Sequence, residues 1–432
     1  MPEQKKYTSI VKREPSSISR VSKSIDITNK LLANTEEPFL IPFRKGDKWG
    51  FSDKNRKILV SCIYEDVDTF SNGIALIKFN GKWGCIDNKG EKIIPCIYEN
   101  KFSFVDDLAY VKYNNKMGFI DKSGNEVVPC KYDSRLPSSK GYYYPSNHDG
   151  CFPFHEGLSR LIYKGNIVYV NKSGETIITC KYDWSEPFFE GLAYVGVNEK
   201  IGFIDKTGKE VIQCIYDHSV IDPNGYPINQ DYYCRFSEGL ASVIKNGKYG
   251  FIDKTNKTIF PFIYDHATPF NKGLAIIKKK DKKGFLDRTG NEVIPCVFDR
   301  ISYFHEGFSV VQGGRKSGYI NGTGEVIIPC IYDCANDFKE GVASVEYKEK
   351  WGYIDITGKE IIPCIYEWSY SFFEGLGEVK KDEKWGCIDK DGKVVIPIIY
   401  DNISLRPNGL AYVSYNNKKG FIDRSGTEFW ED

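Results

Sequence analysis

Apolar and polar residues alternate in short blocks along this chain, and the blocks recur in threes. In residues 350–367 the apolar block 351–354 is followed by a polar Asp-x-x-Gly step at 355–358 and a nearly continuous apolar run at 361–366. A Leu-Ala-x-Val block precedes such pairs, for example at 108–111 and 410–413. Apolar blocks of about four to eight residues between turn residues are typical of β-strands. The pattern therefore predicts an all-β chain with three short strands in each unit.

The residues between the blocks predict how these strands are joined. Asn pairs such as 114–115 tolerate the left-handed backbone of a tight hairpin. At the Asp-x-x-Gly step, Asp can accept backbone N–H groups and Gly supplies positive φ. This turn-capping role is favoured over calcium binding, because a calcium loop needs several closely spaced oxygens and Lys or Arg usually follows the Asp here.

The third block carries its own signals. It is apolar almost throughout, which predicts a strand that is covered on both faces. Its recurring Pro, as at Pro363, cannot donate to a ladder and indicates an outer edge or a bulge. The block ends in a Tyr followed by an acid, as in 216–217 and 332–333. Two interpretations of these pairs are open. They could line a continuous binding surface along the array, or the Tyr could pack inward while the acid begins the next loop, and we favour the second.

A glycine that recurs in the second block gives the length of the repeat. The steps between successive copies are 34 residues, apart from one of 50 and one of 48, so the chain holds eleven units and two insertions, with Val168 in place of the glycine in one unit. The glycine is expected to let a bulky neighbour, often the preceding Trp, or the next unit approach the backbone closely. Val168 therefore predicts a local distortion around 157–190. The glycines are Gly50, Gly84, Gly118, Gly202, Gly250, Gly284, Gly318, Gly352, Gly386 and Gly420.

Units of this kind bury their apolar faces by stacking on one another. We expect eleven tandem three-stranded antiparallel units of about 34 residues, stacked as a propeller-like or open curved solenoid array. Eleven exceeds the roughly four to eight blades of common propellers. The first unit begins with its own first strand (39–44) and the last is expected to reach its own third (427–430). We therefore favour an open, curved array over a closed ring.

The recurring elements resemble those of a known family. Trp-Gly, Asp-x-x-Gly, Pro-Cys-x-Tyr-Asp and Phe-x-x-Gly-Leu-Ala recur in order and in phase over roughly residues 39–430, as in the WG-repeat (KWG-repeat) family of bacterial proteins. The resemblance implies a β-repeat scaffold with an interaction-related role and no shared catalytic residue. Only Trp49, Trp83, Trp351 and Trp385 keep the Trp, so it is not a required ligand-binding group in every unit.

Composition and charge narrow the function classes. With 59 basic and 58 acidic residues, the net charge of +1 provides no global field for nucleic acid or a membrane surface. The chain holds no apolar run of about 18 residues, so no membrane span is expected. Eight of the 13 cysteines share one repeat position, where Phe262 and Ile398 also occur. We interpret them as small buried thiols in a reducing compartment, and expect a cytoplasmic protein without disulfides.

The departures from the repeat define the organisation of the chain. Residues 1–37 form a polar, basic tail, which is expected to be mobile unless it is a docking peptide, and residues 38–432 form the array. Insertions at about 134–150 and 219–234 both follow a third strand, so they are expected to emerge on one edge of the array. The apolar residues of the possible docking peptide are Ile25, Ile27, Leu31 and Leu32.

Both insertions are rich in Tyr, Pro, Asn and Gly, a composition that gives a large contact area with adaptable hydrogen bonds. Insertions on one face of a repeat protein often bind partners, although two tolerated surface loops explain them equally well. The candidate contact residues are Tyr142, Tyr143, Tyr144, His148, Tyr226, Tyr232 and Tyr233.

The candidate chemistry favours binding over catalysis. No Cys/His set with zinc spacing and no common catalytic motif is present. His155 and His305 share one repeat position where other units carry Phe, Asn or Lys, so general-base duty is not expected. We expect a non-catalytic protein- or peptide-interaction scaffold without cofactor or metal. The alternatives are a carbohydrate or small-ligand binding module and, less favoured, a hydrolase with a site among the insertions.

Overall fold

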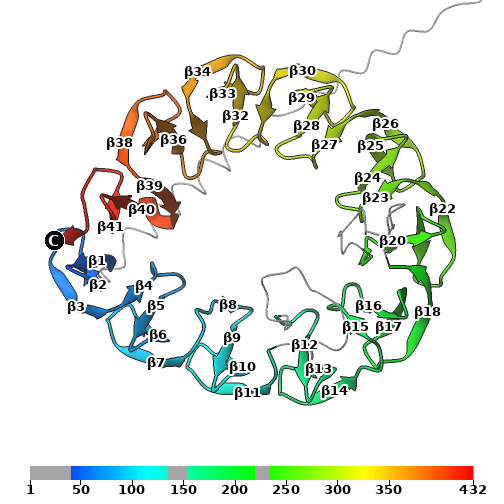
Figure 1. The fold of residues 1–432 in the computed structure, drawn as a ribbon, viewed down its shortest axis with the longest axis horizontal. Coiled ribbons are helices and arrows are strands. Elements are labelled where there is room, and N and C mark those ends of the chain that lie inside the picture. The colour runs from blue at the N-terminus through cyan, green and yellow to red at the C-terminus, as the bar shows by residue number, and fades with distance from the viewer. Residues whose placement is uncertain (1–39, 135–152, 219–233, 432) are drawn as a thin grey trace, which may run out of the picture.

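The computed structural model describes residues 40–134, 153–218 and 234–431. The described residues form eleven small, mostly antiparallel β-sheet units that follow one another around a ring (Figure 1). No sheet closes into a barrel in these residues. The sheets of units 5 and 6 share one pair of strand residues, Asp217 with Ile244. One 3₁₀ turn, η2 (Pro407–Gly409), is the only helical element among them, and no described helix could span a membrane.

The first two strands of every unit form the predicted hairpin. The second strands contain the repeat glycine or its replacement, and we number units 1 to 11 by them. The first strands are β1 (Ile41–Lys45), β5 (Ile74–Phe79), β9 (Leu108–Tyr113), β12 (Leu158–Tyr163), β16 (Leu192–Val197), β20 (Leu240–Lys245), β24 (Leu274–Lys279), β28 (Phe308–Gly313), β32 (Val342–Tyr347), β36 (Gly377–Lys381) and β40 (Leu410–Tyr415). The second strands are β2 (Lys48–Ser52), β6 (Lys82–Asp87), β10 (Lys116–Asp121), β13 (Asn166–Asn171), β17 (Lys200–Asp205), β21 (Lys248–Asp253), β25 (Lys282–Asp287), β29 (Lys316–Asn321), β33 (Lys350–Asp355), β37 (Lys384–Ile388) and β41 (Lys418–Asp423).

The third strands lie on the outer rim of the ring (Figure 1). Their outward side chains are exposed, for example Ile365 at 48% and Val297 at 57%, which corrects the expectation that both faces are covered. The outer-edge position expected from the prolines is confirmed. These strands are β3 (Ile58–Tyr64), β7 (Lys92–Tyr98), β11 (Glu126–Tyr132), β14 (Thr176–Thr179), β18 (Glu210–Asp217), β22 (Thr258–Tyr264), β26 (Glu292–Phe298), β30 (Val326–Tyr332), β34 (Glu360–Tyr366) and β38 (Val394–Tyr400).

A fourth, short strand precedes the first strand in most units and was not predicted. Several of these strands lie on the side of the central opening in Figure 1. Their two-residue length and variable sequence leave no periodic signal. They are β4 (Asp66–Val67), β8 (Phe104–Val105), β15 (Trp184–Ser185), β19 (Phe236–Ser237), β23 (His266–Ala267), β27 (Arg300–Ile301), β31 (Cys334–Ala335), β35 (Trp368–Ser369) and the longer β39 (Asn402–Arg406).

The repeat glycine makes room for the third strand of its own unit. In unit 9, Trp351 pairs with Tyr366 and Tyr353 pairs with Ile362. The paired residues are therefore two positions apart on β33 but four positions apart on β34, so β34 bulges between them. The extra residues bulge over Gly352, and a Cβ there would lie 2.6 Å from the Ile362 carbonyl oxygen. The close neighbour is therefore this bulge, and not the Trp or the next unit as expected.

The unit with Val168 is distorted, as predicted. There the pairs Val168 with Thr179 and Tyr169 with Ile178 follow one another without a bulge, so the third strand does not press on the Val168 side chain. Its strand β14 is four residues long, whereas the corresponding strand of unit 9 has seven.

Hydrogen bonds explain the other recurring residues. In the Asp-x-x-Gly turn, Asp205 Oδ1 accepts the backbone N–H groups of Thr207 (2.9 Å) and Lys209 (3.0 Å), which confirms the turn-capping role. The Tyr of the Tyr-Asp pair is buried, as Tyr332 is at 8% exposure. Its neighbour Asp333 binds Lys316 of its own unit and accepts the N–H of Lys348 in the next unit.

The recurring thiol is half-buried under the first strand. Cys62 Sγ lies 3.6 Å from the carbonyl oxygen of Phe43, and Cys330 Sγ lies 3.9 Å from that of Val311. The spacing of 19 residues is the same in both, so the thiol has one structural role in these units. A small, half-buried thiol agrees with the interpretation drawn from the sequence.

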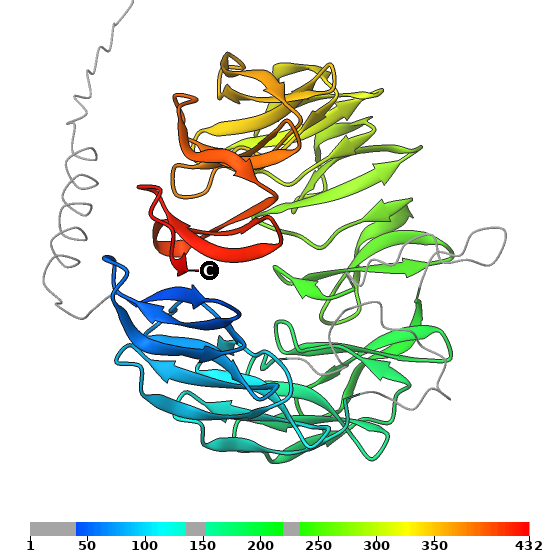
Figure 2. The ribbon, with the colours of Figure 1, turned by 60° about the vertical axis from the view of Figure 1, so that its left-hand side comes forward.

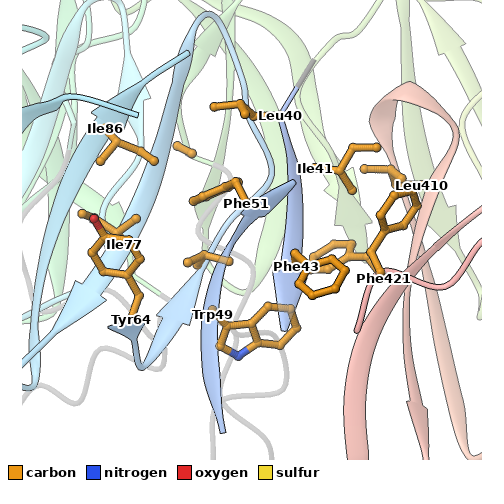
Figure 3. Close-up of a cluster of buried hydrophobic side chains, with 13 residues drawn as sticks. Leu40, Ile41, Phe43, Trp49, Phe51, Tyr64, Ile77, Ile86, Leu410 and Phe421 are labelled. Carbon is orange, nitrogen blue, oxygen red and sulfur yellow. The ribbon is translucent and has the colours of Figure 1, made fainter. Parts of the chain in front are cut away.

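The two ends of the curved row meet. Strand β42 (Trp430–Glu431) pairs in parallel with β1 of unit 1. Just before it, Glu428 bridges to Ile422 of β41 and Phe429 N–H donates to the Phe421 carbonyl (2.8 Å), so the last unit reaches its own third segment, as expected, and also contacts the first unit. Gly46 N–H donates to the Glu431 carbonyl (2.9 Å). Leu410 and Phe421 of unit 11 pack beside Ile41 and Phe43 of unit 1 (Figure 3), and Figure 2 shows the two units adjacent from the side. The preference for an open array did not anticipate this contact between its ends.

Candidate binding pocket between units 8, 9 and 10

One row of residues crosses each complete sheet and varies strongly between units. In unit 9, Cys334 of β31 pairs with Glu346 of β32, which pairs with Trp351 of β33. Directly opposed residues of neighbouring strands point to the same face of a sheet. We call this three-residue set the variable row of a unit. In unit 8 it is Arg300, Gln312 and Ser317; in unit 10 it is Trp368, Lys380 and Trp385.

A pocket lies where the variable row of unit 8 lacks the repeat Trp. Ser317 occupies the position of the repeat Trp, and the pocket beside it has a volume of about 560 Å³. The short strands β27, β31 and β35 of three successive units contribute its walls, and Trp351 of β33 also lines it. Its lining is Arg300, Ile301, Ser302, Val310, Val311, Gln312, Ser317, Asp333, Cys334, Ala335, Asn336, Asp337, Trp351, Trp368, Ser369 and Tyr370.

One wall of the pocket is aromatic. Trp368 contacts Trp351, with ring centroids 5.2 Å apart, and Tyr370 stacks on Trp385 at 5.5 Å and 13°. Trp368 and Tyr370 nevertheless remain 44% and 48% exposed. Trp368 and Tyr370 also contact each other edge-on at 6.3 Å. Each ring is thus supported by other rings and remains partly exposed, which suits a flat or apolar ligand group.

The acids of the pocket already have partners. Lys316 donates a hydrogen bond to Asp333, and this bond is the largest of the effects that hold the pKa of Asp333 below its usual value. Asp337 accepts the Ser302 hydroxyl (2.9 Å) and lies 3.5 Å from His305 Nε2. Arg300 is exposed and forms no ion pair with any described residue. Arg300 is therefore the charged lining residue that remains for a ligand, while the carboxylate of Glu346, beside the lining, is hydrogen-bonded to Cys334.

The pocket thiol is not activated. Burial raises the pKa of Cys334, and a hydrogen bond to Glu346 raises it further. A raised pKa keeps the sulfur in its weakly nucleophilic thiol form near neutral pH.

A second departure from the repeat lies in units 4 and 5. Arg160 is only 1% exposed, and burial raises the pKa of the nearby Glu186 to about 7. Tyr169 donates its hydroxyl to the Glu186 carbonyl at 2.6 Å. Arg160 and Tyr169 are buried, Glu186 is partly exposed, and none of them lines the pocket.

The site residues predicted from the sequence lie outside the described residues. This applies to Tyr142, Tyr143, Tyr144, His148, Tyr226, Tyr232 and Tyr233 of the insertions, and to Ile25, Ile27, Leu31 and Leu32 of the tail. The described flanks agree with the predicted insertion points, because the chain leaves after β11 and β18.

Sequence reasoning missed the pocket. Two signals were available: the loss of the Trp at Ser317, and the two aromatic residues of the segment 368–370, where the equivalent segment of unit 9 reads Cys-Ala-Asn. Neither could be combined into a site without knowing that the short strands of successive units lie together.

Comparison with solved structures finds chains of low similarity. They include a eukaryotic initiation factor (11% identity, 91% of this chain and 95% of the other, TM-score 0.36) and Hsv2 of Kluyveromyces lactis (9%, 43% and 70%, 0.28). A further one is the extracellular domain of the putative one component system BT4673 of B. thetaiotaomicron (11%, 91% and 66%, 0.23). These similarities are too low to transfer any function.

No curated protein sequence matches this chain. The family model described as "WG containing repeat" matches eleven segments: 49–83, 83–116, 117–144, 169–200, 201–224, 231–249, 249–282, 284–316, 318–351, 351–385 and 385–418. These segments cover most of the array, and the chain therefore belongs to the WG-repeat family.

Proposed function

We propose that this protein is a non-catalytic scaffold that binds a peptide segment of a partner protein in the pocket between units 8, 9 and 10. The observation that carries the proposal is the replacement of the repeat Trp by Ser317, beside two half-exposed aromatic side chains, Trp368 and Tyr370. Pockets of about 300–1,000 Å³ lined by aromatic groups and a few polar ones are typical ligand sites.

The arrangement of the repeat supports a scaffold role. The contacts that join units recur from unit to unit and use backbone N–H groups, as in the bond from Lys348 N–H to Asp333. The variable row, in contrast, changes its chemistry in every unit. A constant framework with one varied surface is the usual arrangement of repeat proteins that bind partners.

The side chains of the repeats favour binding over catalysis. The turn carboxylates are engaged in hydrogen bonds, as at Asp205, and the pKa of the pocket thiol Cys334 is raised. Half-buried thiols at the recurring position suit a reducing compartment. We therefore place the scaffold in the cytoplasm and propose no cofactor or metal for it.

The test fills the pocket with the residue that other units carry. Ser317→Trp restores the repeat Trp, and Lys419→Trp makes a matched change at the same position of unit 11. Both variants and the unaltered chain would capture partners from a bacterial lysate, read by mass spectrometry. A partner lost with Ser317→Trp but kept with Lys419→Trp is expected. Identical partners from all three baits would contradict the proposed site.

A carbohydrate ligand is the second candidate, because the half-exposed faces of Trp368 and Tyr370 also suit sugar rings. Binding on a glycan array that is lost with Trp368→Ala would favour it. Silence on the array, together with a Ser317-dependent protein partner, would remove it.

A further inference from the structure

We infer that the pocket recognises an acidic peptide, with a carboxylate bound by Arg300 and a neighbouring aromatic or aliphatic side chain packed on Trp368 and Tyr370. This inference rests on the proposed function and names the chemistry of the partner. It follows from the way charge and aromatic surface are divided around the pocket.

The cationic side is formed by units 7 and 8. The variable row of unit 7 is His266, Lys278 and Lys283, and unit 8 adds Arg300. In unit 9 the residue at the position of Lys283 is Trp351, which contacts Trp368 of the following unit. Arg300 holds the position in unit 8 that Trp368 holds in unit 10. Because Trp351 contacts Trp368, we infer that the equivalent Lys283 lies toward Arg300. Lys278 is ion-paired with Asp281 at 2.8 Å, so Lys283 and Arg300 are the residues that bring positive charge to this side of the pocket.

Arg300 is suited to a carboxylate. A guanidinium presents its donors in a planar fork that matches the two carboxylate oxygens. Arg300 is exposed and has no ion pair with a described residue, whereas Asp333 and Asp337 already have partners. An acidic ligand would supply the missing partner, and a basic ligand would meet an unpaired like charge.

The aromatic side is formed by units 9 and 10. Trp368 and Tyr370 are steadied by Trp351 and Trp385, so binding costs little ordering of these side chains. Gln312 pairs with Arg300 in unit 8, lines the pocket and offers an amide to a peptide backbone. The charge of Arg300, the amide of Gln312 and the aromatic rings of unit 10 are spread over units 8 to 10. We favour a peptide over a free acid because a peptide can contact all of these groups at once.

The carboxylate could belong to an Asp or Glu side chain or to a peptide C-terminus. Fluorescent hexapeptides that contain one Asp and one Phe at separations of zero to three residues distinguish these sources when each is made with a free and with an amidated C-terminus. Peptides with Lys in place of Asp serve as charge controls. Binding to the full chain is measured by fluorescence polarisation.

We expect Asp–Phe peptides to bind, with at least tenfold weaker binding to Arg300→Glu and to Ser317→Trp. Arg315→Glu, which makes the same charge change at an exposed position of the unit 8 hairpin, is expected to leave binding unchanged. A C-terminal source would show as a requirement for the free carboxyl group.

Two results would overturn the inference in distinguishable ways. Binding that is lost with Ser317→Trp but unaffected by Arg300→Glu, or that persists equally for Asp and Lys peptides with amidated C-termini, refutes the acidic ligand and leaves the proposed function standing. If no peptide binds, the inference fails; if, in addition, no lysate partner depends on Ser317, the proposed function fails as well.

Discussion

The carboxylate of Glu306 accepts the backbone N–H of Gly341, 35 residues later in the next unit, at 2.8 Å. Five further Glu–Gly pairs make the same contact between successive units, and we call these contacts the Glu latches. They are Glu156 with Gly191, Glu190 with Gly239, Glu238 with Gly273, Glu340 with Gly375 and Glu374 with Gly409. The acceptor is the Glu side chain, whereas the donor is a backbone N–H group. The latch therefore requires a Glu in one unit but no particular side chain in the next.

The latch is absent between units 7 and 8, where Lys272 stands in the position of the Glu. Lys272 has the same left-handed backbone as the latch residues, with φ of 52°. Lys272→Glu is therefore expected to add a hydrogen bond to Gly307 N–H and to stabilise the protein by about 0.5–1.5 kcal/mol. Thermal unfolding of this variant beside Lys272→Ala checks it. An equal melting temperature for both variants would contradict the latch.

The bulge over the repeat glycine predicts a severe effect of a single methyl group. In Gly352→Ala the new Cβ would lie 2.6 Å from the Ile362 carbonyl oxygen, so the third strand must shift. We expect a loss of about 1–3 kcal/mol in the free energy of unfolding. Gly322→Ala is the control, because its Cβ would meet no atom within 4 Å. Similar urea midpoints for the two variants would refute the explanation.

The Asp-x-x-Gly turn should tolerate an amide. Asn321 accepts the N–H of Thr323 at 3.0 Å, as Asp355 accepts that of Thr357 at 2.9 Å. Asp355→Asn is expected to change the free energy of unfolding by less than about 0.5 kcal/mol, whereas Asp355→Ala removes the acceptor and costs about 1 kcal/mol. Chemical denaturation would rank the variants. An equal cost for both would mean that the charge, and not the hydrogen bonds, matters.

Acid should weaken the array through the Lys–Asp contacts. Hydrogen bonds from lysines lower the pKa of these aspartates below the unfolded value of 3.8, as for Asp333 with Lys316 and Asp401 with Lys384. A carboxyl whose folded pKa is depressed contributes stability that is present above its unfolded pKa and lost as the pH falls through its folded pKa. The melting temperature is therefore expected to fall below about pH 3.8. A melting temperature that stays constant from pH 5 to 2.5 would argue against this contribution.

The contact between units 1 and 11 depends on Arg44, which is 7% exposed and donates to the Lys419 carbonyl. Arg44→Met keeps the apolar stem and removes these donors. We expect faster hydrogen exchange in β41 and β42, with little change in unit 6. Arg315→Met is the control. Unchanged exchange in the last unit would show that the apolar contacts of Leu410 and Phe421 suffice.

The sequence predicted the units well because each is built from local pairs. The hairpins, the Asp-x-x-Gly turns and the buried Tyr332 follow from periodicity and turn chemistry. The cause of the glycine was missed, because the bulge that covers Gly352 depends on the register between β33 and β34, which no local pattern shows. The covered third strand was also wrong, since an apolar run does not reveal whether a further layer lies outside it.

The relationships between distant residues could not be predicted. The pairing of Trp430 with Arg44 joins residues 386 positions apart (430 − 44), and the described strands show no other parallel pairing of this kind. The pocket likewise needs Arg300, Trp351 and Trp368 together, from three units whose short strands carry no periodic signal. The pattern of one unit holds no information about how neighbouring variable rows combine.

The contact between the first and last units limits how this protein can evolve. In an array with free ends, duplication of one unit lengthens the array and leaves other contacts intact. Here an added or deleted unit would move β42 away from β1, so a change in unit number also breaks a contact between the ends. New specificity can instead arise by single substitutions in a variable row, or by lengthening the loops between units, because neither changes the circumference.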